Sequence, residues 1–341
     1  MTAISKKKKH FLINEQLRGY LKKYDRESKL PVSYNDLLRY NETVPHRDKS
    51  GKETLWETVI YDRSMTDELN KGLTMIYSIL KSDGDTDVLE HLYVSRIDYC
   101  TFGNSNPFRV RIVNLFNDNY DYFYVKKDDA SRVYGLELEH ILSPNRINYF
   151  VDDDTLIEEH IPGIPGNDFI AGYLKKPECN KVRIAKEFVK FNERCFVRLL
   201  GDMRSYNYVV DITPDFEDEQ YRIRPIDFDQ QSYEGKKTMY LPQFFKENNA
   251  VVNLCMELMT PETFSQYRNE ERTLIAHRLK AERTRFEELL ACMKNDTISL
   301  ADKEEQLKQE LAKHHNDPAF KACKNMGEIV SYHLEVVLAG K

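Results

Sequence analysis

Cysteine is scarce in this chain, and the few that occur are far apart. The six residues are scattered, with no CxxC pair and no Cys/His spacing of the kind that holds zinc. In a chain of 341 residues this pattern predicts ordinary reduced thiols in a folded core, as in a cytoplasmic protein. The six are Cys100, Cys179, Cys195, Cys255, Cys292 and Cys323.

Long apolar runs and an excess of positive charge are also lacking. No stretch approaches the roughly 20 apolar residues that cross a bilayer, and no apolar segment of signal-peptide length follows the lysines at 6–9. We therefore expect neither a membrane span nor a signal peptide. The formal charge of −6 argues against a general nucleic-acid binder, which normally has a strongly basic face. Nothing in the sequence indicates an oligomeric state.

The composition is that of a folded protein, with 41% hydrophobic and 31% charged residues, and its length predicts two or three packed units. Residues 1–90 are mixed and polar, and are expected to form a partly helical N-terminal extension whose role the sequence does not indicate. Residues 91–161 are rich in predicted strands. Residues 162–341 begin with the turn-forming string Pro162-Gly163-Ile164-Pro165-Gly166 and are mainly helical in pattern.

The strand-rich part has a regular order. Residues 108–113 alternate apolar and basic, which is the period-2 pattern of a half-buried strand, and residues 120–125 form a second strand after an Asn-Asp-Asn turn. A helix follows, for which Ser131 is a possible N-cap and Ser143-Pro144 the end. Strands are then predicted at 147–151 and 155–159. The expected order is strand, strand, helix, strand, strand.

The helical part contains one short hairpin. An amphipathic helix is predicted over 182–199, followed by strands at 208–212 and 221–226, and further helices are predicted at 270–293 and 300–314. The interleaved Glu, Lys and Arg of the last two helices are typical of a solvated helix face.

The most informative string begins where the helix over 182–199 ends. Asp202 lies just after that helix, Asn207 five residues later, and Asp227 in Ile226-Asp227-Phe228-Asp229 just after the hairpin. Phosphoryl transfer needs such a set, because one carboxylate orients or deprotonates the acceptor hydroxyl while an amide oxygen and a second carboxylate hold Mg²⁺. Taken singly, each of these residues is an ordinary turn former.

These strings resemble those of the protein-kinase-like superfamily, which includes aminoglycoside and related small-molecule phosphotransferases as well as eukaryotic-type protein kinases. The resemblance implies that Asp202 is the catalytic base, Asn207 a magnesium ligand and Asp227 the principal magnesium ligand. Gly201-Asp202 and Asp229 favour the small-molecule branch. Arg204 favours the protein-kinase branch, where a cation two residues past the catalytic Asp touches the transferred phosphate.

The upstream strands correspond by the same resemblance to a small nucleotide-binding lobe. Its phosphate-binding lysine would be Lys126, or Lys127 if the strand register slips by one residue. The helix glutamate that pairs with this lysine would be Glu137, with Glu139 as the alternative. The carbonyl of Glu159 and the N–H of Ile161 would receive adenine, and Gly103 alone is placed to cover phosphates, since no Gly-x-Gly-x-x-Gly loop is present.

The sequence therefore predicts a two-lobed α+β protein-kinase-like fold with an N-terminal extension. The expected activity is ATP- and Mg²⁺-dependent transfer of the γ-phosphoryl group to a hydroxyl, with a small molecule favoured as acceptor. Three alternatives stay open, namely a protein kinase, a non-catalytic kinase-shaped binding module, and transfer of AMP instead of phosphate.

Overall fold

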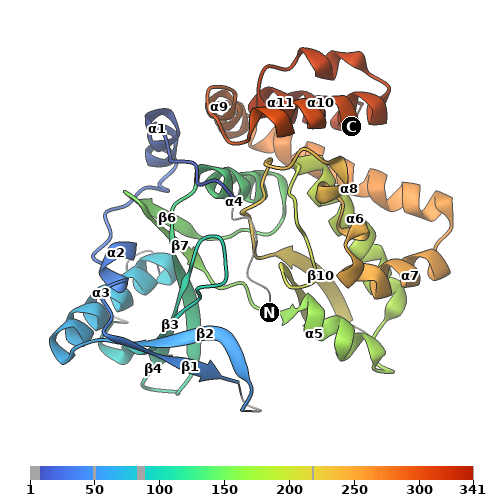
Figure 1. Ribbon diagram of the computed structural model, residues 1–341. Coiled ribbons are helices and arrows are strands. Elements are labelled where there is room, and N and C mark those ends of the chain that lie inside the picture. The colour runs from blue at the N-terminus through green and yellow to red at the C-terminus, as the bar shows by residue number, and fades with distance from the viewer. Residues whose placement is uncertain (1–7, 49–50, 83–88, 217–218, 341) are drawn as a thin grey trace. The chain divides into compact units, whose positions relative to one another are not determined.

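The computed structural model describes residues 8–48, 51–82, 89–216 and 219–340, and its elements are shown in Figure 1. The chain is an α+β protein with an antiparallel sheet in its N-terminal part and a largely helical C-terminal part. Two of the lysines at 6–9, Lys6 and Lys7, lie outside the described residues. No helix in the described part of the chain is long and apolar enough to span a bilayer.

The contacts divide the chain into two compact units. One comprises residues 1–129 and 147–160, and the other comprises residues 130–146 and 161–341. The helix at 130–142, which the sequence analysis assigned to the nucleotide-binding lobe, therefore groups with the C-terminal residues. The predicted extension, residues 1–90, groups with the strands that follow it.

The first unit is built on a seven-stranded sheet in the order β1-β2-β3-β4-β5-β7-β6, in which all neighbouring strands are antiparallel. The described residues before position 90 supply two of these strands and three helices. The elements are α1 (Glu15–Lys23), α2 (Tyr34–Leu37), β1 (Glu42–Arg47), β2 (Glu53–Ile60), α3 (Arg63–Ser82), β3 (Leu92–Tyr99), β4 (Phe108–Asn114), β5 (Tyr120–Lys127), β6 (Tyr149–Asp152) and β7 (Thr155–Glu159). The strands expected at 108–113, 120–125, 147–151 and 155–159 are thus confirmed to within a few residues.

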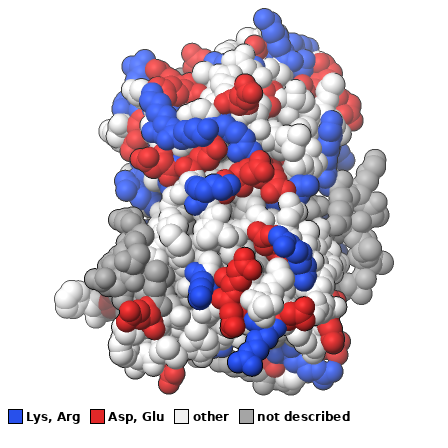
Figure 2. Space-filling view, turned by 90° about the vertical axis from the view of Figure 1, so that its left-hand side faces the viewer, with Lys and Arg blue, Asp and Glu red and all other residues white. Residues whose placement is uncertain are grey.

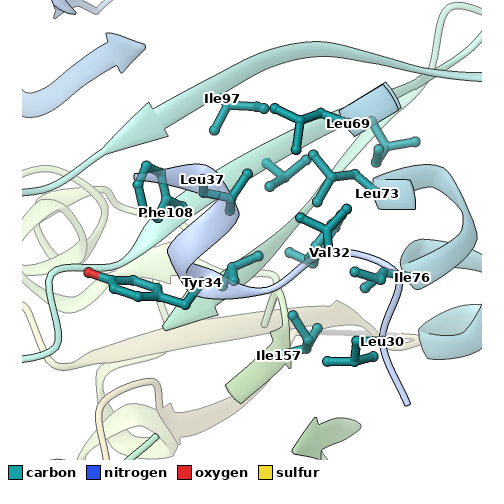
Figure 3. Close-up of a cluster of buried hydrophobic side chains, with 14 of the residues drawn as sticks. Leu30, Val32, Tyr34, Leu37, Leu69, Leu73, Ile76, Ile97, Phe108 and Ile157 are labelled. Carbon is teal, nitrogen blue, oxygen red and sulfur yellow. The ribbon is translucent and has the colours of Figure 1, made fainter. Parts of the chain in front are cut away.

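Helix α3 covers one face of this sheet. Its Leu69, Leu73 and Ile76 pack on Ile97 and Phe108, and the segment that carries Leu30, Val32 and Leu37 closes the same core (Figure 3). The alternation predicted for residues 108–113 is present, because Phe108, Val110 and Ile112 are buried while Arg109 and Arg111 lie on the opposite face. The N-terminal residues are therefore structural partners of the sheet.

The turn between β6 and β7 anchors the N-terminal segment to this unit. Asp152 accepts a hydrogen bond from the Leu30 backbone N–H at 2.9 Å, and the Asp153 carbonyl accepts one from the Arg18 guanidinium at 2.6 Å. Acidic turn residues therefore fix the position of a segment more than 120 residues earlier in the chain.

The second unit is mainly helical around a small three-stranded sheet in the order β10-β9-β8. Its elements are α4 (Ala130–Leu142), β8 (Ile164–Pro165), α5 (Gly166–Ala171), α6 (Lys181–Arg198), β9 (Tyr208–Pro214), β10 (Glu219–Pro225), α7 (Asn249–Leu258), α8 (Pro261–Ala281), α9 (Arg283–Lys294), α10 (Ala301–His315) and α11 (Met326–Leu338). Residues 270–293, predicted as one helix, belong to two, because the backbone leaves helical geometry at Glu282.

Helix α6 is the central element of the second unit. The Asn180 side chain caps its N-terminus by accepting from the Arg183 N–H, and Ile184, Phe188, Phe191 and Cys195 form its buried face. All six cysteines are buried free thiols, as the sequence predicts. On the face shown in Figure 2, basic side chains are interspersed with acidic ones and are not gathered in one region.

Candidate active site

The candidate site begins at the C-terminal end of α6, where the chain turns sharply. Leu199 caps the helix in the left-handed conformation, with φ 54°, and Asp202 is also left-handed, with φ 58°. Such φ values are uncommon outside glycine and persist where the surrounding structure fixes them. The fixing contacts here are backbone hydrogen bonds from Gly201 N to Gln230 O at 3.1 Å and from Asp202 N to Met239 O at 3.0 Å.

The next turn joins Asp202 to Asn207. The Asn207 side-chain Nδ2 donates to the Asp202 carbonyl at 2.7 Å and lies 3.4 Å from Asp202 Oδ2. The Ile226 N–H donates to the Asn207 carbonyl at 3.0 Å, so Asp227 follows directly after a residue bonded to Asn207. The structure therefore brings together the three residues that the sequence analysis selected, although Asp227 is 25 positions after Asp202 in the sequence.

Arg204 spans two carboxylates beside this turn. Its Nε donates to Asp202 Oδ1 at 2.8 Å, its Nη1 donates to Glu247 Oε1 at 2.9 Å, and its guanidinium carbon lies 4.9 Å from the centre of the Phe245 ring. Burial raises the pKa of the Asp202 carboxyl above its ordinary value, Arg204 opposes this rise, and the nearby Asp227 carboxylate adds to it. A raised pKa makes a carboxylate a better proton acceptor.

Asp227 and Asp229 are joined by an arginine that the sequence analysis did not identify. The Arg132 Nε donates to Asp229 Oδ1 at 2.8 Å, and its Nη2 donates to Asp227 Oδ1 at 2.7 Å. The Arg132 side chain is only 2% exposed, and that of Asp229 is 8% exposed, whereas that of Asp227 is 32% exposed. Arg132 is 95 residues from Asp227, and no local pattern indicates a pairing at that separation.

Close packing holds α4 against the segment that carries these carboxylates. A Cβ added to Gly135 would lie 3.0 Å from Cβ atoms of both Phe228 and Gln231, so glycine permits the close approach. Ser131, predicted as the N-cap of this helix, lies inside it, and its hydroxyl donates to the Gln231 carbonyl at 2.8 Å. The capping prediction was wrong, because the hydroxyl bonds to a distant segment of the chain.

The two glutamates considered on α4 are both fully buried and both paired within the second unit. Glu137 accepts hydrogen bonds from Nε and Nη2 of Arg285 on α9 at 2.8–3.0 Å. Glu139 is paired with Arg198, near the end of α6. Tyr134 adds a hydrogen bond to Asp296 at 2.9 Å, so α4 is held by polar contacts along its length.

The predicted phosphate-binding lysine lies in the first unit. Of the two alternatives, Lys126 has a buried side chain and Lys127 an exposed one. Lys126 Nζ lies 2.7 Å from Glu158 Oε2, and both side chains are less than 10% exposed. Glu158, on the neighbouring strand β7, was not identified from the sequence. The signal that could have identified it is a glutamate in an otherwise apolar strand, on the same side of the sheet as Lys126.

The remaining predicted residues lie in less distinctive surroundings. Gly103 lies in the loop between β3 and β4, where an added Cβ would meet only Pro107 Cδ, at 3.5 Å. Glu159 ends β7, and its carboxylate accepts from the Asn148 N–H at 2.8 Å. Ile161 is buried, and the division of the chain into two units falls between His160 and Ile161.

Magnesium is the metal that this set of donors suits. Mg²⁺ prefers hard oxygen ligands and is commonly held by one or two carboxylates together with phosphate oxygens and water. Among the described residues, no three His, Cys, Asp or Glu side chains gather closely enough to hold a metal ion by themselves. An Asn amide oxygen and the Asp227 carboxylate, supplemented by phosphate, fit such a partial ligand set.

Comparison with known proteins gives structural likenesses only. No family model matches the chain, and no curated protein matches it. The protein is structurally similar to the autoinhibited serine kinase domain of the giant muscle protein titin, with 15% identity and a TM-score of 0.29, over 58% of this chain and 81% of that one. A structure of titin kinase and its flanking domains is similar at 13% identity and a TM-score of 0.28, over 72% of this chain and 55% of that one.

Proposed function

We propose that this protein is a kinase-like phosphotransferase that moves the γ-phosphoryl group of ATP to a hydroxyl, with Mg²⁺ as cofactor. The observation that carries the proposal is that Asp202 and Asn207 are hydrogen-bonded to each other in the second unit and that Asp227 directly follows a residue bonded to Asn207. Two turns far apart in sequence are joined there by the Asn207 hydrogen bonds to Asp202 and by the Ile226–Asn207 bond.

Asp202 is proposed to orient the acceptor hydroxyl and to take its proton as the oxygen bonds to the γ-phosphorus. The bond between that phosphorus and the β–γ bridging oxygen breaks, and ADP leaves. The environment of Asp202 suits this role, because burial raises its pKa while its carboxylate keeps 27% exposure.

Asn207 and Asp227 are proposed to hold the metal, which when bound neutralises charge on the phosphates. The hydrogen bonds of Asn207 to Asp202 use Nδ2, so its Oδ1 is the atom that would bind a cation. Arg132 holds the Asp227 carboxylate through Oδ1, and a carboxylate with about four lone-pair sites can accept a cation as well.

Arg204 is proposed to contact the transferred phosphate, and Lys126 to bind phosphate oxygens of the nucleotide. Gly103, Glu159 and Ile161 remain proposed nucleotide contacts. Glu137 was expected to orient the lysine. Its bidentate pairing with Arg285 gives it a second role, which is to anchor α4 to α9.

A small-molecule acceptor is favoured over a peptide. The segment between Asp229 and Pro242 is short, and much of it is packed inside the unit, with Gln231, Ser232, Tyr233 and Tyr240 buried. A Cβ added to Gly235 would lie 2.9 Å from the Lys303 carbonyl, so this segment lies tightly on α10. Such packing leaves little chain from which to build a platform for an extended peptide.

The test is thermal unfolding with and without Mg·ATP, followed by an assay of phosphate transfer from labelled ATP. A ligand that binds only the folded state at 100 times its Kd adds about 2.7 kcal/mol of stability. We expect a metal-dependent rise in Tm that Asp227→Asn abolishes and the exposed control Asp302→Asn retains. No rise at millimolar ATP, or an equal rise in Asp227→Asn, would contradict the proposal.

A non-catalytic nucleotide-binding module is the second candidate, and Arg132 is the observation that favours it. A buried guanidinium already bridges Asp227 and Asp229, and it can supply positive charge without a metal. Tm shifts with ATP that are independent of Mg²⁺, without turnover over a broad panel of acceptors, would support this candidate. Transfer of AMP would instead appear in mass spectra as a larger added group.

A further inference from the structure

A cavity of 890 Å³ lies in the second unit among α6, α7, α8 and the segment at residues 237–244. Figure 1 shows α6 beside α7 and α8, and α6 is in extensive contact with each of them. The volume is within the range of small-molecule pockets, about 300–1,000 Å³. None of the residues proposed for phosphoryl transfer lines this cavity.

Most of the lining is apolar. Phe188 and Val189 of α6 form one wall, Cys255 and Met256 of α7 another, and Phe264 of α8 a third. Met256 is 70% exposed, which is unusual for a methionine beside so much other apolar surface. A ligand with an apolar body would bury this surface.

One end of the cavity is polar and carries an excess of positive charge. Glu193 is buried and accepts from Arg268 Nε at 2.8 Å and from Arg272 Nε at 2.5 Å. Lys237 Nζ lies 3.0 Å from His314 Nδ1. Among the described residues Lys237 forms no ion pair, although its backbone N–H donates to the Glu310 carboxylate. Among the lining residues, the cations Lys237 and Arg268 thus outnumber the carboxylate Glu193.

Burial, reinforced by Lys237, lowers the pKa of His314 to about 4. The imidazole is therefore neutral at pH 7. It accepts a hydrogen bond from the Lys237 ammonium group but does not neutralise the charge of that group. A carboxylate is a stronger partner for an ammonium group than a neutral ring nitrogen is. Lys237 therefore gains most from a ligand that brings a negative charge.

The apolar part and the cationic part of the cavity lie one after the other along α6. Phe188 is at the apolar end, and Phe196, whose ring centre is 5.2 Å from that of His314, is at the cationic end. Eight residues of helix separate them, or about 12 Å at 1.5 Å per residue. We infer that this cavity binds a fatty acid, with the hydrocarbon chain along α6 and the carboxylate on Lys237. This inference is independent of the proposed phosphotransfer.

The test is isothermal titration of the full chain with dodecanoate and, separately, with dodecanol below their aggregation limits. We expect saturable dodecanoate binding that Lys237→Met weakens by about tenfold to a hundredfold, because a charge-assisted hydrogen bond is lost. The neighbouring exposed lysine provides the matched control, and Lys236→Met should leave the Kd unchanged. Dodecanol should bind more weakly than dodecanoate, and equally to wild type and Lys237→Met.

A second variant tests the apolar part of the cavity. Val252→Trp places a large ring in the lining and should abolish binding of both ligands, while the Tm reports whether the variant folds. Failure of dodecanoate to bind wild type would overturn the inference. Equal affinity for dodecanoate and dodecanol, or an equal loss in Lys236→Met and Lys237→Met, would overturn it as well.

Discussion

Replacing Arg132 by methionine tests the role of the charge cluster at the candidate active site. The substitution keeps an unbranched apolar stem and removes the guanidinium that bonds to Asp229 at 2.8 Å and to Asp227 at 2.7 Å. Removing one partner of a buried ion pair typically costs about 3–5 kcal/mol. Since the Asp227 side chain is 32% exposed and water can compensate it in part, we expect the lower end, about 3 kcal/mol.

The assay is urea denaturation of the full chain in metal-free buffer and again with Mg²⁺ in large excess over the protein. Without Arg132, two carboxylates face each other, so Mg²⁺ should restore more stability to Arg132→Met than it adds to wild type. The double variant Arg132→Met/Asp229→Asn removes the more buried charge and should recover part of the loss. Arg222, exposed on β10, provides the control.

The reasoning would be refuted by a loss below about 1 kcal/mol in metal-free buffer, which is the size expected of a surface ion pair. It would also be refuted if Arg222→Met were equally destabilising, or if the Asp229→Asn change gave no recovery.

Three further predictions concern stability. Burial lowers the pKa of His333 to about 3, so its neutral form contributes stability above the unfolded-state pKa of about 6.5, and this contribution is lost as the pH falls from there toward 3. The loss of stability between pH 7.5 and pH 5.5, measured by urea denaturation, should be about 1.4 kcal/mol smaller in His333→Gln than in wild type; equal losses would count against it. Leu73→Ala, in the core under the sheet, should cost about 2–5 kcal/mol by urea denaturation, and a loss under 1 kcal/mol would show that α3 contributes little. A double-mutant cycle of Glu137→Gln and Arg285→Met should give a coupling energy above about 1 kcal/mol, and additive losses would show that the pair is not coupled.

Local patterns were sufficient to predict much of the secondary structure. The alternation at residues 108–113 and the apolar spacing of α6 identify their elements, because a buried face imposes its period on the sequence. The same logic explains why Lys126, and not Lys127, has the buried side chain. The motif spacing selected Asp202, Asn207 and Asp227, and in the structure Asn207 is hydrogen-bonded to Asp202 and to Ile226, the residue before Asp227.

Long-range partners could not be predicted in the same way. Arg132, Glu158 and Arg285 have ordinary local contexts, and their importance follows from residues 32 to 148 positions away. The assignment of α4 to the C-terminal residues has the same origin. A helix with two buried glutamates is compatible with several neighbours, and only the arginines that meet those glutamates decide among them.

The attachment of α4 to the C-terminal residues has a consequence for synthesis of the chain. Glu137 emerges from the ribosome 148 residues before Arg285, which at about 5–20 residues per second is a delay of about 7–30 s. During that interval the strands on either side of α4 can already pair, while the Glu137 carboxylate still lacks the arginine from α9. The Glu137–Arg285 pair, and with it the second unit, can therefore be completed only after α9 has been made.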